Sequence, residues 1–113
     1  MAVKTFFFYP EVFQAPKGFN ARFSYGRLVV KNTQTGDRIE FSKDTHGIWD
    51  ANNRIYINPV YRWVDNGETY YGLSHRDGAE LIIEIVDFNG NISRDGALQA
   101  VQSFINRAVE SIS

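Results

Sequence analysis

The chain has 113 residues, 43% of them hydrophobic and 15% aromatic, which is one domain's worth of sequence and too apolar for a disordered chain. Twelve basic and thirteen acidic residues leave a formal net charge of −1, which argues against general binding of polyanions. The absence of cysteine excludes disulfides and thiol chemistry, and no window of the sequence reaches the roughly 18 apolar residues of a membrane span. We expect a single domain over residues 1–113, soluble and cytoplasmic, with no N-terminal signal peptide.

The chain begins with sequence patterns of β-strands. Residues 3–9 are rich in aromatic side chains and end at Pro10, which predicts a first strand at a sheet edge. Residues 19–25 alternate, so that Phe23 and its neighbours two residues apart point one way and Arg22 points the other. These patterns predict two strands separated by a loop.

Two hairpins follow from turn-forming residues between alternating segments. The first covers residues 27–42, and its core face carries the apolar residues Leu28, Val30, Ile39 and Phe41. The opposite face then carries Arg27, Lys31 and Arg38, with Glu40 beside them. The second hairpin covers residues 61–71 around a three-residue turn that ends at Gly67, which favours a glycine bulge.

The remaining strands lie around these hairpins. Residues 54–58 alternate and are expected to end at Pro59. Residues 79–88 form the longest apolar run, with apolar side chains on both faces, which predicts a central strand covered on both sides. Glu84 interrupts the second face, and a half-buried carboxylate there would need a partner.

The chain ends in a predicted helix at about residues 94–112, with Ser93 as its N-cap. An apolar stripe at helical spacing runs along it, made of Leu98, Val101, Phe104, Ile105, Ala108, Val109 and Ile112. The predicted fold is therefore α+β: a mainly antiparallel sheet of five to seven strands and one C-terminal amphipathic helix.

Arginine-rich positions are the candidate ligand site. Guanidinium groups suit phosphates and carboxylates, and the basic strand faces above bring several of them together. We expect an anionic ligand to be contacted by Arg22, Arg27, Lys31, Arg38 and, from an exposed loop, His75 and Arg76.

Aromatic residues are the candidate partner surface, because seventeen of them exceed what a thin core hides. The residues assigned to this surface are Phe6, Phe8, Phe13 and Trp49, and a homodimer is expected. No catalytic residue, metal site or cofactor is assigned, because no nucleophile elbow, helical Glu-x-x-His pair or phosphate-binding glycine loop is present.

These features favour a small non-catalytic intracellular binding protein over an enzyme. It would sequester an anionic small ligand such as a nucleotide, or occupy and inhibit a macromolecular partner as small phage or immunity proteins do. One alternative is single-stranded nucleic-acid binding through the basic and aromatic residues 17–25. Another is a small hydrolase using His46 or His75, with Asp44 beside His46.

Overall fold

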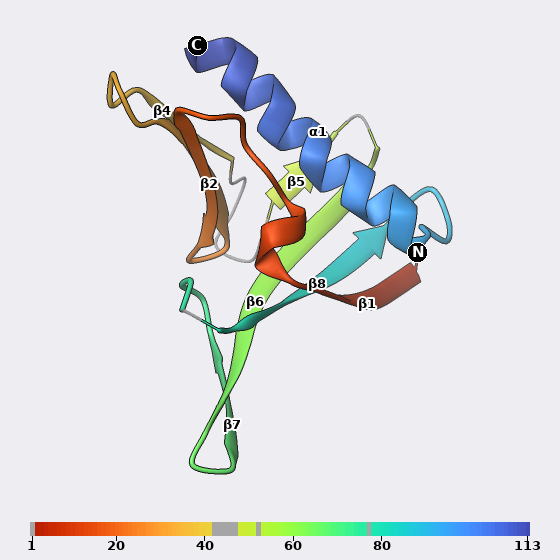
Figure 1. The fold of residues 1–113 in the computed structure, drawn as a ribbon. Helices are drawn as coiled ribbons and strands as arrows, with labels where there is room; N and C mark the ends of the chain where they lie inside the picture. The colour runs from red at the N-terminus through yellow and green to blue at the C-terminus, as the bar shows by residue number, and fades with distance from the viewer. Residues whose placement is uncertain (1, 42–47, 52, 77) are drawn as a thin grey trace.

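The strands of the computed structural model, which describes residues 2–41, 48–51, 53–76 and 78–113, form two antiparallel sheets (Figure 1). The larger sheet has β1 (Ala2–Phe8), β8 (Glu80–Asp87), β6 (Ile55–Asp65) and β5 (Ile48–Asp50) side by side, and β7 (Glu68–Gly72) extends one end of β6. The smaller sheet has β2 (Phe19–Ser24), β3 (Arg27–Asn32) and β4 (Arg38–Phe41) in sequence order. A 3₁₀ turn, η1 (Pro10–Val12), connects β1 toward β2.

The α-helix of the described residues, α1 (Arg94–Ile112), crosses one face of the larger sheet and reaches the smaller one (Figure 1). Ser93 caps it, because its Oγ accepts a hydrogen bond of 3.0 Å from the backbone N–H of Gly96. The buried stripe of α1 comprises Ala97, Ala100, Val101, Phe104, Ile105 and Ala108. The predicted α+β class, helix and cap are confirmed. No helix among the described residues is long and apolar enough to cross a membrane.

Both predicted hairpins are present, but the second has a tighter turn than expected. Asp65 pairs directly with Glu68, so the loop contains only Asn66 and Gly67. Both have positive φ angles, 51° and 78°, which is the type I′ geometry that matches the twist of the strands. The expected three-residue bulged turn is therefore wrong.

Pro59 does not end a strand; it lies inside the 11-residue β6. On one side β6 pairs with β8 throughout this region, with Pro59 opposite Ile83. On the other side β5 pairs only up to Ile57 and β7 begins at Tyr61. The missing N–H of Pro59 therefore falls where β6 has a neighbour on one side only, as proline requires.

The described strands number eight and divide into two antiparallel sheets, whereas the sequence predicted five to seven strands in a sheet. Backbone contacts join the sheets at one end of β2, where Ser24 bridges to Ser74 and Tyr25 N–H donates to Leu73 O at 2.7 Å. The sequence did not predict β5, because a segment of three residues is too short to show an alternating pattern.

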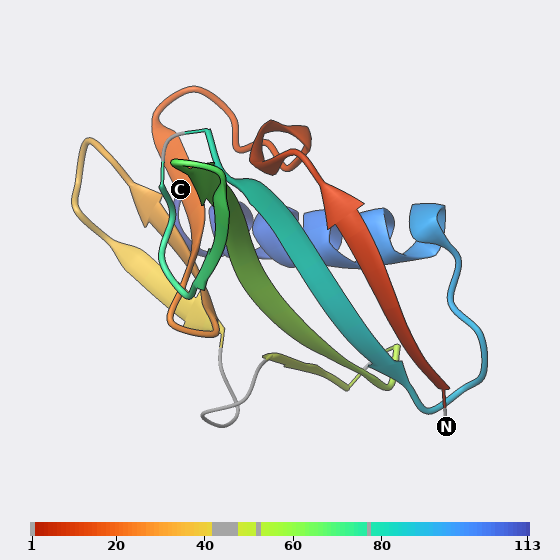
Figure 2. The ribbon, with the colours of Figure 1, turned by 90° about the horizontal axis from the view of Figure 1, so that it is seen from below.

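The central strand β8 is covered on one side only. Leu81, Ile83 and Ile85 are fully buried and face α1. Their neighbours Ile82 and Val86, on the other face, are half-buried. No described helix or strand covers this face of β8 in Figure 2. The expectation that both faces of this strand are covered within the chain is therefore wrong.

Candidate ligand-binding cleft

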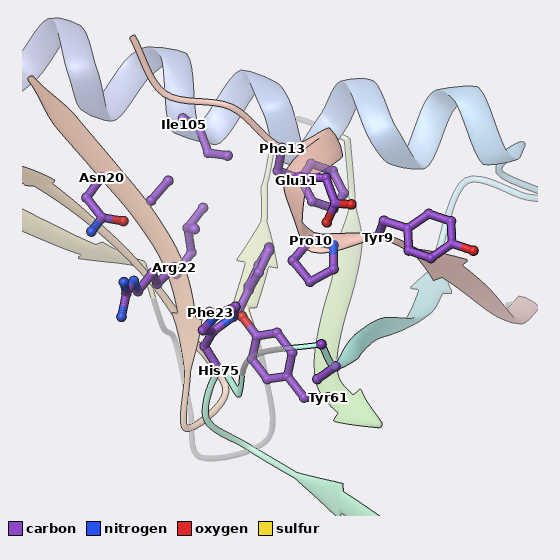
Figure 3. A pocket seen from close by; sticks show the side chains of 14 residues that line it. Tyr9, Pro10, Glu11, Phe13, Asn20, Arg22, Phe23, Tyr61, His75 and Ile105 are labelled. Carbon is purple, nitrogen blue, oxygen red and sulfur yellow. The ribbon is translucent and has the colours of Figure 1, made fainter. Parts of the chain in front are cut away.

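A cavity of about 510 Å³ opens where the two sheets part. One wall is β2, the opposite wall is η1 with the residues beside it, and Tyr61 and His75 lie at one end (Figure 3). The apolar part of its lining comes from core residues that include Phe13 and Phe23. This volume falls in the range of about 300–1,000 Å³ that small-molecule sites occupy.

The edge of β2 that faces away from β3, joined at Ser24 and Tyr25 to Ser74 and Leu73, contributes backbone groups to this cavity. Tyr25 and Gly26 both have positive φ angles, 54° and 76°, and form a two-residue hairpin turn between Ser24 and Arg27. In such a hairpin the residues flanking the turn are hydrogen-bonded to each other, and the next ones point their N–H and C=O groups outward. The backbone groups of Phe23 and Ala21 therefore point away from β3, and both residues line the cavity.

Tyr61 connects the two sheets at the end of the cavity. Its side chain is 2% exposed, and its ring meets His75 edge-on with centroids 5.5 Å apart. Burial raises the pKa of the Tyr61 phenol above its usual value near 10, while a backbone hydrogen bond from Phe23 and the charge of Arg22 act in the opposite direction. The phenol is therefore protonated at neutral pH and can donate a hydrogen bond.

The raised pKa of Tyr61 makes stability sensitive to alkaline pH. Below about pH 10 the phenol is protonated in both the folded and unfolded states, whereas above it the unfolded chain loses this proton first. The free energy of unfolding of the wild type should therefore fall, relative to Tyr61→Phe, as the pH rises through 10. Urea unfolding of both proteins at pH 8 and in the alkaline range measures this difference. The control Tyr25→Phe removes an exposed hydroxyl and should follow the wild type; a constant difference between wild type and Tyr61→Phe would contradict the expectation.

The four predicted basic strand residues share the outer face of the smaller sheet. In the strand register Val29 lies between Arg22 and Glu40, and Lys31 lies between Asn20 and Arg38. Glu40 pairs with both Arg27 and Arg38, at nitrogen to oxygen distances of 3.5 and 2.8 Å. Among the described residues, neither Arg22 nor Lys31 forms an ion pair. Of the four, Arg22 lines the cavity.

The two predicted loop residues, His75 and Arg76, lie in different places. His75 lines the cavity beside Tyr61. Arg76 instead places its guanidinium over the Trp63 ring, 4.4 Å from the centroid, on the arm formed by β6 and β7. His75 and Arg22 therefore line the same cavity, whereas Arg76 does not.

The predicted partner surface needs correction. Phe8 and Phe13 are 2% and 8% exposed and pack against each other in the core, so neither is available on the surface. Phe6 is half-buried on the same face of β1, opposite Ile83, whereas Phe7 points outward and is 49% exposed. Trp49 is half-buried on the face of the larger sheet that α1 does not cover. Alternation showed that the phenylalanines divide between two faces, but only the sheet order showed which face is covered.

The structure bears differently on the two alternative functions, single-stranded nucleic-acid binding and hydrolysis. Phe23 is buried, and the alternation of β2 puts Phe19, Ala21 and Phe23 on the opposite side from Arg22, so rings and cations do not form one stacking platform. Asp44 and His46 lie outside the described residues. Within the described part of the chain, no group of three or more acidic or histidine side chains could hold a metal ion.

Comparison with protein-family models, curated proteins and solved structures finds no match to this chain.

Proposed function

We propose that this protein is a non-catalytic binding protein that holds an anionic small ligand in the cleft between its two sheets, with Arg22 contacting the anion. The observation that carries the proposal is that Arg22, on β2, is one of the residues that line the cleft and has no ion-pair partner among the described residues.

Charge supports this assignment. Arg27 and Arg38 are partly neutralised by Glu40, whereas Arg22 and Lys31 are not paired within the described chain. Their Cα atoms are diagonal neighbours on adjacent strands, a spacing of about 7–8 Å. A phosphate or carboxylate held by the fork of Arg22 would therefore also feel the charge of Lys31.

The cleft itself supports a ligand with an uncharged body behind its anionic group. The interior offers aromatic walls, the Tyr61 phenol and the outward backbone groups of Ala21. Glu11 lines the wall opposite β2 and disfavours a second anionic group there. A nucleoside monophosphate has this distribution of charge, because its phosphate is at one end and its base is uncharged.

The expected result for Arg22→Glu is a loss of ligand affinity of about ten- to hundredfold, because hydrogen bonds to charged groups contribute about 1.5–3 kcal/mol. The probes are AMP, inorganic phosphate and adenosine, titrated by calorimetry, with native mass spectrometry of the freshly purified protein to detect a retained molecule.

Arg27→Glu is the matched control, because it makes the same charge reversal on the same sheet face but does not line the cleft. Its affinity should stay within about threefold of the wild type. Equal losses of affinity in the two variants would show that Arg22 acts only through the overall charge of the sheet face, without contacting the ligand. Absence of any retained molecule, together with no binding of all three probes, would overturn the proposal.

A further inference from the structure

The larger sheet has a second face that the cleft does not use, turned away from α1 and here called the bare face. Figure 2 looks onto it, with β1, β8 and β6 in front of the helix. The strand register arranges its side chains in four rows across the sheet. These rows are Val3, Val86, Tyr56 and Trp49; Thr5, Glu84 and Asn58; Phe7, Ile82 and Val60; and Glu80, Arg62 and Tyr71.

Two of these rows are apolar and partly open to solvent. In the first, Trp49 and Tyr56 pack against each other at 4.9 Å and both contact Phe88, while Val3 at the sheet edge is 57% exposed. In the third, Phe7 is 49% exposed beside the half-buried Ile82. A solvated face of an antiparallel sheet normally carries polar side chains, so a contiguous apolar face indicates an interaction surface.

The row between them is polar and carries a carboxylate, Glu84, but no basic side chain. Glu84 is exposed and forms no hydrogen bond or ion pair with any described residue. Beside it, the Oδ1 atom of Asn58 is buried without a hydrogen-bond partner within the described chain. An exposed carboxylate without a partner among the described residues and a buried amide oxygen without one therefore lie side by side between the two apolar rows.

The basic side chain in these four rows, Arg62, already has an acidic partner. Arg62 forms an ion pair with Glu80, and its guanidinium lies over the Phe7 ring, 4.8 Å from the centroid. The fourth row is therefore neutral, and Glu84 leaves the face with one uncompensated negative charge. A second copy of the chain facing it would bring two Glu84 carboxylates into an apolar interface without a cation for either.

We propose that the bare face docks a protein partner whose apolar surface carries an arginine or lysine at its centre, placed on Glu84. Charge complementarity selects this occupant: the basic group supplies the donors that Glu84 needs, and the flanking apolar rows exclude water from the contact. This arrangement matches the usual anatomy of a binding hot spot, in which a central Arg contact is surrounded by apolar contacts.

The test is a selection of phage-displayed random linear peptides on the immobilised wild-type protein. We expect enriched sequences to share a basic residue flanked by apolar ones. The tightest peptide, synthesised with a fluorophore and titrated by anisotropy, should lose at least about tenfold in affinity on Glu84→Gln and on Phe7→Ala. The same peptide with its basic residue changed to Glu should bind Glu84→Arg more tightly than it binds the wild type.

Glu110→Gln is the matched control, because it removes an exposed carboxylate from α1, on the other side of the sheet, and should leave the affinity unchanged. Thermal unfolding of each variant separates lost binding from lost folding. The proposal is overturned if no basic residue is enriched, or if the affinity survives Glu84→Gln. The proposal is also overturned if sedimentation velocity shows that the wild type is a dimer and that Phe7→Ala dissociates it, because the bare face would then bind a second copy of the chain.

Discussion

Replacing Ile83 by alanine is expected to lower the free energy of unfolding by about 2–5 kcal/mol. Ile83 is 0% exposed in the middle of β8, where it lies between Phe6 of β1 and Pro59 of β6 under α1. Deleting three buried carbons there removes apolar burial and leaves a cavity that three packed elements cannot close. Urea unfolding followed by far-ultraviolet circular dichroism measures the change.

Ile82→Ala is the matched control for this prediction. It makes the same chemical change at the next residue, on the bare face, where the side chain is only half-buried. The expected loss is about 1 kcal/mol or less, because less apolar area leaves water at this position. Losses of equal size at the two positions would show that the bare face is covered in the free protein.

Replacing Asn32 by alanine is expected to cost about 2–4 kcal/mol, because one side chain makes three hydrogen bonds. Its Oδ1 accepts from the backbone N–H groups of Gln34 and Thr35 at 3.0 and 3.2 Å, which shapes the turn between β3 and β4. Its Nδ2 donates at 3.1 Å to the C=O of Ile112, the last residue of α1. Asn32 is only 9% exposed, so the alanine variant leaves these backbone groups without a nearby replacement.

Asn32→Asp separates the two halves of this contact. The carboxylate keeps the acceptor for the turn, but it loses the donor and places a negative charge at the C-terminal end of the helix dipole. We expect this variant to be destabilised as well, with a smaller loss at low pH, where the carboxyl is protonated. Asn91→Ala, at an exposed asparagine, should change the stability by no more than about 0.5 kcal/mol. A loss in Asn32→Ala no larger than in Asn91→Ala would refute the role given to this side chain.

The two proposed surfaces use different sheets and can be tested separately. The cleft depends on Arg22 of the smaller sheet, whereas the bare face depends on Glu84 and Phe7 of the larger one. A variant in one should therefore leave binding at the other unchanged. If Arg22→Glu also abolished peptide binding at the bare face, the two surfaces would be coupled through the core they share.

Features that depend on near neighbours in the chain could be predicted from the sequence. Ser93 marked the start of the helix, because a cap and the N–H it satisfies are three residues apart. Alternation placed Arg27, Lys31 and Arg38 on one face of a hairpin, because the strand period and a short loop set the register locally.

Which faces are covered depends on packing between segments far apart in the chain, so no local pattern predicts it. Whether Phe7 or Phe8 is exposed depends on where α1 lies, and that follows from contacts nearly a hundred residues apart in the chain. Pro59 could stay within a strand because β5 stops before it and β7 starts after it. The cleft likewise needs Arg22, Tyr61 and His75 to meet from three separated segments, a packing outcome that no local pattern encodes.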